Sequence, residues 1–342
     1  MKCFFAAEQF RHDPKAFLSS GAPQPNPEIP ERARRLREGA KAAGLDEARP
    51  PAFGLGPIAA VHTPEYLEFL ENIFERWRRI PDASAEVIPN IHPTHRDGRR
   101  PLSAVGQAGL HMADTACPIG EHTFEAACWS AWTAVATADS VAGGGPDAWA
   151  YALCRPPGHH AFADLAGGFC FLNNSAIAAG RLRDRGAARV AIIDVDLHHG
   201  NGTQGVFYAR ADVLTVSLHA DPLRFYPFFW GHADERGEDA GLGYNLNLPL
   251  ERGSGDEAFL EALDAGIRRA RSFAPDALVV ALGLDAFRGD PFGGLAVTTD
   301  GFSRIARKLK GLERPTVLVQ EGGYLCPELG DNLAAFLRGF GG

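Results

Sequence analysis

Short runs of apolar residues recur along the chain, and more polar, helix-like segments separate them. Each run is rich in Val, Ile, Leu or Ala and lacks strict alternation between apolar and polar positions. This pattern is typical of a parallel strand that is covered on both faces. The runs occupy residues 3–6, 149–154, 190–196, 213–219, 277–284 and 316–320.

Amphipathic segments fill the intervals between these runs. Thr63 and Pro64 supply an N-cap and a first-turn proline before EYLEFLENIFERW. Ser254 and Glu257 form a capping-box pattern before AFLEALDAGIRRA. Because strands and helices alternate, we predict an α/β fold with one open parallel sheet flanked by helices. Neither an internal repeat nor a linker divides the chain, so we predict a single domain over residues 1–342.

One stretch breaks the alternation. Residues 81–123 are rich in Pro, Gly and His and show neither strand nor helix periodicity. A structureless loop of this length inside a compact domain usually serves a function. We therefore predict a functional insert over residues 81–123.

Composition and charge exclude several classes of protein. The formal net charge of −8 argues against a nucleic-acid partner, because phosphate backbones need a basic face. No run of about 18 apolar residues could span a membrane, and the N-terminal MKCFFAAEQFRHD has too short an apolar stretch for a signal peptide. The six cysteines show no C-x-x-C spacing and suit reduced core thiols, so we expect a cytoplasmic protein.

The run at residues 190–196 leads into candidate chemistry. It belongs to the segment AIIDVDLHHGNGTQ, which places Asp194, Asp196 and His198 at alternate positions. In a strand these side chains would share one face, at the carboxyl end where open α/β sheets bind ligands. A lone D-x-D is more often a hydrogen-bonded strand end. Several chelating groups so close together favour a ligand site.

Other runs end in similar groups. RPPGHH delivers His159 and His160 after one run, Asp285 follows another, and EGGY offers Tyr324 after the last. Taken singly, these could be a surface histidine pair, a strand terminus and a core tyrosine. Together they predict an Asp, His and Asp set at one edge of the sheet, which suits a divalent zinc or iron ion with a position open for water.

These motifs resemble a known family. RPPGHH, GGFCFLNN, IDVDLHHGNGTQ, SLH, the aspartate before a G-D-P turn, and EGGY occur in the order found in zinc-dependent deacetylases of the histone deacetylase and acetylpolyamine amidohydrolase superfamily. The resemblance runs from IPERA to PELGDN, and it is strongest to the bacterial acetylpolyamine amidohydrolases. It implies the arginase/deacetylase fold and the removal of acetyl or short acyl groups from small amines.

The resemblance also implies roles for the catalytic residues. His160 would be the general base and acid, with Asn201 as its partner where some relatives have aspartate. A neutral amide raises the basicity of a histidine less than a carboxylate does, so we expect a lower pKa for this base than in those relatives. Tyr324 would donate to the oxyanion, and Asp194 would orient His159. The implied zinc ligands, which Fe²⁺ or Co²⁺ could also use, are Asp196, His198 and Asp285.

Further implied residues line the substrate channel and a second ion site. Phe169 and Tyr226 would form aromatic walls, and the Gly168 carbonyl could accept the scissile N–H. Arg32, within IPERA, matches an arginine near the internal acetate exit. A structural potassium ion would lie beneath the zinc site, lined by Asp194, Asp196, His198, Ser217 and Leu218.

Substrate identity stays open. The insert resembles one that narrows the mouth and builds a homodimer in the acetylpolyamine branch. Asp114 falls near a position that reads the distal ammonium of the substrate, but a second such position is Val105 here. Acetylated polyamines, shorter diamines, acetyl-lysine and unrelated small amides are all candidates, and Asp114 could equally be a solvated surface residue.

Two other classes share some of these features. A binuclear manganese hydrolase of the arginase type needs a carboxylate two residues after Asp285, where this chain has Phe287. A protein that binds acetylated amines without cleaving them would be expected to lack the histidine pair or the tyrosine, and this chain keeps both. We therefore favour the deacetylase.

Overall fold

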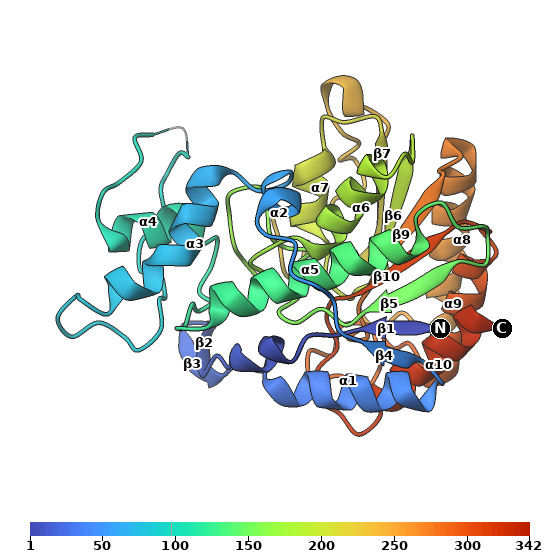
Figure 1. Ribbon diagram of the computed structural model, residues 1–342, viewed down its shortest axis with the longest axis horizontal. Coiled ribbons are helices and arrows are strands. Elements are labelled where there is room, and N and C mark those ends of the chain that lie inside the picture. Colours follow the sequence, from blue (N-terminus) through green and yellow to red (C-terminus); the bar gives the residue numbers. More distant parts are fainter. Residues whose placement is uncertain (97) are drawn as a thin grey trace.

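The computed structural model describes residues 1–96 and 98–342. Within these residues, parallel strands form one eight-stranded sheet in the order β4-β1-β5-β10-β9-β6-β7-β8 (Figure 1). The predicted parallel sheet is therefore confirmed. The strands are β1 (Lys2–Phe4), β4 (Asp46–Ala48), β5 (Trp149–Ala152), β6 (Val190–Asp194), β7 (Val213–Ala220), β8 (Asn245–Leu250), β9 (Ala277–Leu282) and β10 (Thr316–Gln320).

Helices cover both faces of this sheet (Figure 1). One layer packs its apolar side chains with β6, β7, β9 and β10 in the largest buried cluster, and it contains α1 (Pro30–Ala42), α8 (Asp256–Phe273), α9 (Thr299–Lys310) and α10 (Leu329–Gly341). The opposite layer contains α5 (Thr123–Val141), α6 (Asn174–Asp184) and α7 (Asn201–Phe207). Both faces of the central strands are thus buried, as their continuous apolar runs require.

A separate apolar cluster lies to one side of the sheet, on the left in Figure 1. It joins α5 to α2 (Gly56–Ala59), α3 (Pro64–Trp77) and α4 (Ala104–His111). The stretch over 81–123 is not irregular throughout, because α4 lies within it. Its function stays a prediction. Ser103 caps α4 by accepting a hydrogen bond from the Gly106 N–H at 3.1 Å. Residue 97 of the insert lies outside the described residues.

Two sheet strands and a hairpin were not predicted. β4 and β8 are the edges of the sheet, and their sequences DEA and NLNLPL lack a continuous apolar run. An edge strand is covered less completely, so it needs fewer apolar residues. The hairpin of β2 (Ala16–Ser19) and β3 (Ala22–Pro25) is mostly exposed and carries two prolines in β3.

The two helix starts show one success and one error. Thr63 caps α3 as predicted, because its side chain accepts a hydrogen bond from the Tyr66 N–H. The capping box at Ser254 is wrong, since α8 begins at Asp256 and has no side-chain cap. Glu257 instead pairs with Arg304 at 2.7 Å.

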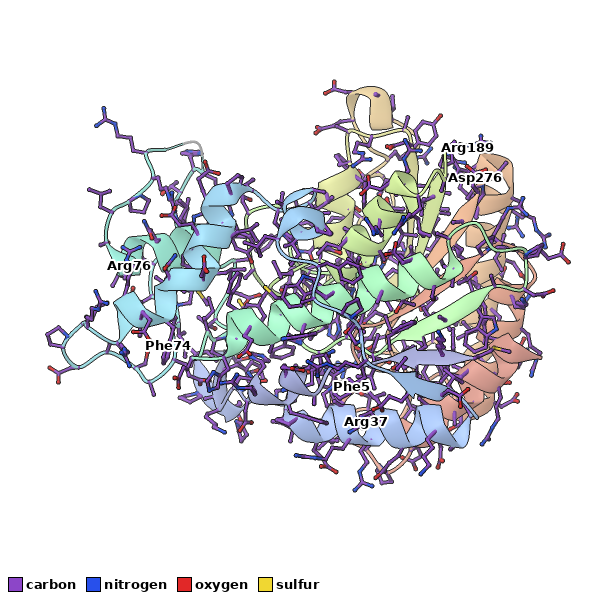
Figure 2. All side chains as sticks on the ribbon, in the orientation of Figure 1. Phe5, Arg37, Phe74, Arg76, Arg189 and Asp276 are labelled. Atoms are coloured by element: carbon purple, nitrogen blue, oxygen red, sulfur yellow. The ribbon has the colours of Figure 1, made fainter. Side chains whose placement is uncertain are left out.

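The two ends of the sheet differ in chemistry. Before β6 and β9, the Arg189 N–H donates to Asp276 Oδ2 at 2.9 Å and the Asp276 N–H donates to the Arg189 carbonyl at 2.8 Å (Figure 2). Arg37 of α1 lies over the Phe5 ring at 4.9 Å, also labelled in Figure 2. The first contact joins the residues that precede β6 and β9 at the amino end of the sheet, and the second packs α1 against the chain after β1. The candidate chemistry lies at the carboxyl end.

Two expectations from composition can be compared with the structure. Every cysteine is free, and all but Cys326 are buried, as expected for reduced core thiols. Across the described residues, no helix combines the length and the apolar character needed to cross a membrane.

Candidate active site and metal centre

The site lies just beyond the carboxyl ends of β6 and β9. These strands end at Asp194 and Leu282, so both predicted strands are too long. After β6 the backbone leaves the sheet because side chains accept the N–H groups of Asp196 and His198. Asp194 Oδ1 accepts from the Asp196 N–H at 3.0 Å, and Asp196 Oδ1 accepts from the His198 N–H at 2.8 Å. Asp196 and His198 therefore stand on a turn and not on alternating strand positions.

The turn brings together the predicted metal ligands. Ligand atoms of Asp196, His198 and Asp285 all lie within 4.8 Å of one another, and all three residues are buried. His198 Nδ1 is 3.3 Å from Asp196 Oδ1 and 3.2 Å from Asp285 Oδ2. The Leu197 N–H donates to Asp285 Oδ1 at 3.0 Å, which fixes the second carboxylate against the turn.

The chemistry of this donor set fits a divalent cation. Among the described residues, no Lys or Arg forms an ion pair with Asp196 or Asp285. Burial would lower the pKa of His198, but Asp196 and Asp285 outweigh it and raise that pKa to about 9, so these buried carboxylates favour a positive charge at this point. Two carboxylate oxygens and one imidazole nitrogen are ligands that zinc and iron accept. The residues present therefore fit a catalytic metal.

The glycines of this site allow close approach. A Cβ on Gly322 would lie 2.2 Å from Asp285 Oδ2 and 2.6 Å from Asp196 Oδ2, so a larger residue would displace both carboxylates. The Gly322 N–H also donates to Asp196 Oδ2 at 2.7 Å. The EGGY turn therefore forms a direct hydrogen bond to Asp196, one of the candidate metal ligands.

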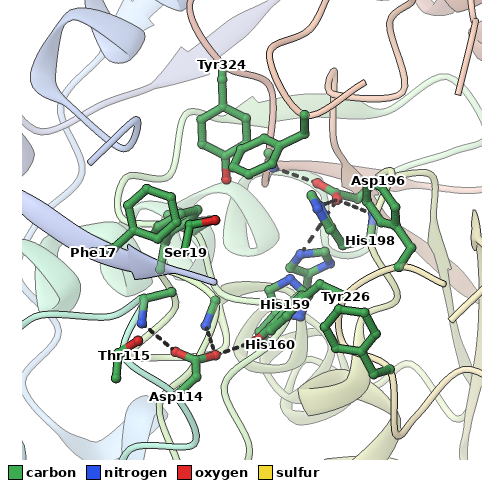
Figure 3. Close-up of a pocket in the computed structure, with 18 of the residues that line it drawn as sticks. Phe17, Ser19, Asp114, Thr115, His159, His160, Asp196, His198, Tyr226 and Tyr324 are labelled. Carbon is green, nitrogen blue, oxygen red and sulfur yellow. Dashed lines mark hydrogen bonds and ion pairs between the residues drawn. The ribbon is translucent and has the colours of Figure 1, made fainter. Parts of the chain in front are cut away.

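The histidine pair lies beside this donor set (Figure 3). The rings of His159 and His160 are 4.0 Å apart, and both residues are buried. His159 Nδ1 is 2.9 Å from Asp194 Oδ2, and His160 Nδ1 is 2.7 Å from Asn201 Oδ1. Both partner oxygens accept, so each Nδ1 carries the proton. A neutral imidazole in this state has a free lone pair on Nε2.

Burial and neighbouring charges shift the pKa values of the two histidines in opposite directions. Burial alone would lower the pKa of His159, but the Asp196 and Asp194 carboxylates outweigh it and raise that pKa to about 10. Burial lowers the pKa of His160 well below its ordinary value, and His159 and His198 lower it further. Opposite shifts in adjacent titratable groups indicate different roles. His160 is therefore the neutral imidazole of the pair at neutral pH.

Tyr324 faces the histidines across the cavity (Figure 3). Its N–H donates to Asp290 Oδ2 at 2.8 Å, and the Arg32 guanidinium lies 4.7 Å from its ring centroid. Arg32 is buried, pairs with Glu28, and donates to the Gly323 carbonyl at 2.6 Å. Burial raises the pKa of Tyr324 well above its ordinary value, so the phenol keeps its proton and can donate at neutral pH.

A cavity of about 580 Å³ leads from solvent to these groups, and seven Phe and Tyr residues line it. Gly168 and Phe169 line it in left-handed conformations, with φ of 51° and 67°. A Cβ on Gly168 would meet the His160 ring at 2.3 Å, so only glycine fits there. The lining aromatic residues are Phe17, Phe169, Phe225, Tyr226, Phe228, Phe292 and Tyr324.

Asp114 joins the insert to the channel wall and is half-buried. Its Oδ2 accepts from the Tyr226 hydroxyl at 2.7 Å and from the Gly168 N–H at 3.0 Å, while Oδ1 accepts from the Ala116 N–H at 2.8 Å. Val105 packs against the apolar cluster of α3 and α4. Of the two predicted mouth positions, only Asp114 reaches the cavity.

Comparison with known proteins decides the family. The family model described as the histone deacetylase domain matches residues 26–340. This chain belongs to the histone deacetylase family. Family membership explains why the motifs of the site occur in one order along the chain, and it makes this protein a deacetylase-type hydrolase.

Two acetylpolyamine amidohydrolases match this chain over almost their full length. The chain is 51% identical over 342 residues to an acetylpolyamine amidohydrolase from Burkholderia pseudomallei, covering 100% of this chain and 99% of that protein. It is 40% identical to an acetylpolyamine amidohydrolase from Mycoplana ramosa, with 100% of both chains covered. A crystal structure of the B. pseudomallei acetylpolyamine aminohydrolase matches with a TM-score of 0.96 and 50% identity, covering 100% of this chain and 98% of that one.

The predicted potassium residues also lie together in this deacetylase. Asp194 of β6 pairs in register with Ser217 of β7, and Leu218 follows directly. The Ser217 hydroxyl lies 2.8 Å from His219 Nδ1. Their role in binding a second ion stays a prediction.

Some residues of the site were not singled out from the sequence. Phe17, Phe225, Phe228 and Phe292 line the cavity from loops and a hairpin that have no distinctive motif. Asp290 and Glu321 lay inside quoted motifs, G-D-P and EGGY, but no role was assigned to them. A buried carboxylate next to a candidate catalytic group was the signal that could have identified both.

Proposed function

We propose that this chain is a zinc-dependent amide hydrolase that removes acetyl or short acyl groups from small amines such as acetylated polyamines. The observation that carries the proposal is that three buried candidate metal ligands, a histidine pair and a tyrosine meet at the end of one cavity lined by aromatic residues. The names of the full-length relatives point to acetylated polyamines as the substrate class.

Asp196, His198 and Asp285 would hold the zinc ion, and Fe²⁺ or Co²⁺ would suit the same donors. When bound, the ion supplies a Lewis acid that polarises the amide carbonyl and lowers the pKa of a water molecule from about 16 toward 7. The absence of a carboxylate at Phe287, which is buried, supports one metal over two.

The chain's own residues handle the protons and the developing charge. His160 takes a proton from the attacking water at Nε2 and later delivers it to the leaving amine, because its Nδ1 proton is engaged by Asn201. Tyr324 donates its phenol proton in a hydrogen bond to the oxyanion of the tetrahedral intermediate. His159, oriented by Asp194, tunes the charge beside this base.

The channel would hold the acyl-amine chain. Phe169 and Tyr226 pack against its methylene groups, and the Gly168 carbonyl accepts the amide N–H of the substrate. Asp114 would face the distal ammonium from the channel wall. Asp114 already accepts hydrogen bonds from Tyr226 and Gly168, and the second position that would contact the ammonium group is Val105, which carries no charge. Recognition of a distal ammonium therefore has weaker support, and acetyl-lysine and shorter acetylated diamines are the alternative substrates. We expect the protein to act as a homodimer with a structural potassium ion.

A matched set of substrates tests the proposed function. We would measure kcat/KM of the zinc-loaded enzyme on N-acetylputrescine, N-acetylcadaverine, N-acetylspermidine, an acetyl-lysine peptide and a neutral aryl acetamide. We expect the acetylated diamines or polyamines to lead by about 100-fold, which is about 2.7 kcal/mol of transition-state discrimination. Equal kcat/KM on the peptide or the neutral amide would contradict the proposal that acetylated small amines are the substrates. No turnover of any amide would contradict the proposal that the protein is an amide hydrolase.

A further inference from the structure

Glu321 is a buried carboxylate that the proposed mechanism does not use. It opens the EGGY turn directly after β10 and has no exposed surface. Among the described residues, no Lys or Arg pairs with its carboxylate, and burial raises its pKa to about 7. A carboxyl group in such surroundings is costly unless hydrogen bonds satisfy it, so its contacts deserve a physical explanation.

Those contacts join the EGGY turn to the turn that carries the histidine pair. Glu321 Oε2 accepts from the Gly158 N–H at 2.7 Å and from the His159 N–H at 3.0 Å. Its Oε1 accepts from the Ser175 hydroxyl at 2.7 Å. Ser175 lies in the first turn of α6, so three segments distant in sequence meet at one side chain.

The backbone of Glu321 is fixed as well. Its N–H donates to the Leu282 carbonyl of β9 at 2.9 Å, and its carbonyl accepts from Arg32 Nη2 at 2.8 Å. Tyr324 follows three residues later in the same turn. The backbone of Glu321 therefore belongs to the turn that carries Tyr324, and its carboxylate holds the backbone of the turn that carries His159 and His160.

We propose that Glu321 is a positioning residue that fixes the turn of His159 and His160 relative to the turn of Tyr324. The inference rests on the proposed function, in which the substrate carbonyl lies between the base His160 and the donor Tyr324. Displacement of such groups by about 1 Å can cost on the order of 100-fold in rate. A residue that sets their separation therefore acts on kcat without touching the substrate.

Two substitutions of Glu321 distinguish the effect of its side-chain length from the effect of its charge. E321Q keeps the side-chain length: its oxygen can accept from Gly158 and His159, and its amide can donate to the Ser175 hydroxyl. E321D keeps the charge but is one methylene shorter, so it cannot make the same contacts from the same backbone. We expect E321Q to keep kcat within about 3-fold of the wild type and E321D to lose about 100-fold in kcat, with KM nearly unchanged.

The measurement combines kinetics on an acetylated diamine with two readouts that do not depend on turnover. Bound zinc per chain should be equal in the wild type and both variants. Amide hydrogen exchange at Gly158 and His159 should be slow in the wild type and E321Q and faster in E321D. Wild-type kcat in E321D, or an equal loss in both variants, would overturn the inference.

Ser175→Ala decides the matter if E321D does not fold. This variant leaves Glu321 in place and removes one of its hydrogen bonds, and we expect a loss of about 5-fold in kcat with KM unchanged. Wild-type kcat in this variant would overturn the inference in that case. Failure of the wild type itself to cleave any acetylated amine would count against the proposed function, whereas the exchange rates at Gly158 and His159 would still report on Glu321.

Discussion

The floor of the cavity, formed by Asp196, His198, Asp285, the histidine pair and Tyr324, is almost fully buried, whereas its mouth is open to solvent. At the mouth, Leu18 and Phe228 are 39% and 50% exposed, and Arg224 is exposed beside them. The carboxylates and histidines at the floor form hydrogen bonds to backbone groups or to other polar side chains. Leu18 and Phe228 at the mouth are apolar, and the Phe228 ring lies 6.3 Å from the ring of Tyr226.

This difference assigns different functions to the two regions. A rigid, water-poor floor suits the chemical step, because preorganised groups stabilise a transition state without rearranging. An open aromatic mouth suits selection among substrates, because its contacts depend on what lies beyond the acyl group. Changes at the floor should therefore appear in kcat, and changes at the mouth should appear in KM and in substrate preference.

Among substitutions that leave the candidate metal ligands in place, the largest effect is expected from Tyr324→Phe at the floor. Loss of the phenol removes the donor to the oxyanion, which should lower kcat about 100- to 1000-fold. Zinc content and thermal stability should stay at wild-type values. Tyr226→Phe is the counterpart on the channel wall and should cost about 5-fold, mostly in KM. Wild-type turnover in Tyr324→Phe would remove this residue from the mechanism.

A smaller effect is expected from Asn201→Asp, which changes the charge beside the base. Burial lowers the pKa of His160, so the acid limb of kcat/KM should lie below pH 6.5 in the wild type. A carboxylate at position 201 favours the protonated imidazole and should raise that pKa. Because the base must be unprotonated, the acid limb moves to higher pH. A pH–rate profile that does not move would show that His160 is not the titrating base.

The smallest effect is expected from Phe228→Ala at the mouth. Removing this half-exposed ring should weaken contact with the substrate chain by about 1 kcal/mol, or about 5-fold in KM. Steady-state kinetics on N-acetylputrescine should show kcat unchanged. A loss confined to kcat would contradict the separation of floor and mouth.

The same two regions differ in how far the sequence predicted them. Floor residues occur in short contiguous motifs at the ends of apolar runs, and parallel strands carry such ends to one edge of the sheet. The predicted grouping of Asp196, His198 and Asp285 therefore matches the structure, although a turn and not a strand arranges them. Both central strands were predicted two residues too long. At the end of β6 the reason is that the side-chain hydrogen bonds of Asp194 and Asp196 are not visible in hydropathy.

The mouth was harder to predict for a physical reason. Phe17, Phe228 and Phe292 come from a hairpin and loops whose positions depend on long-range packing. The helix α4 and the edge strands β4 and β8 were missed because short or half-covered elements need few apolar residues. Buried polar residues such as Glu321 gave no periodic signal, and only their contacts show what they join.

Metal dependence can be measured most directly by zinc titration of the metal-free protein, with acetate release from N-acetylputrescine and bound metal followed together. We expect no turnover without metal and a linear rise that ends at one zinc per chain. His198→Ala, which removes the imidazole donor, should neither bind zinc tightly nor gain activity. Full turnover by the metal-free protein, or a requirement for two manganese ions per chain, would contradict the proposed single-metal deacetylase.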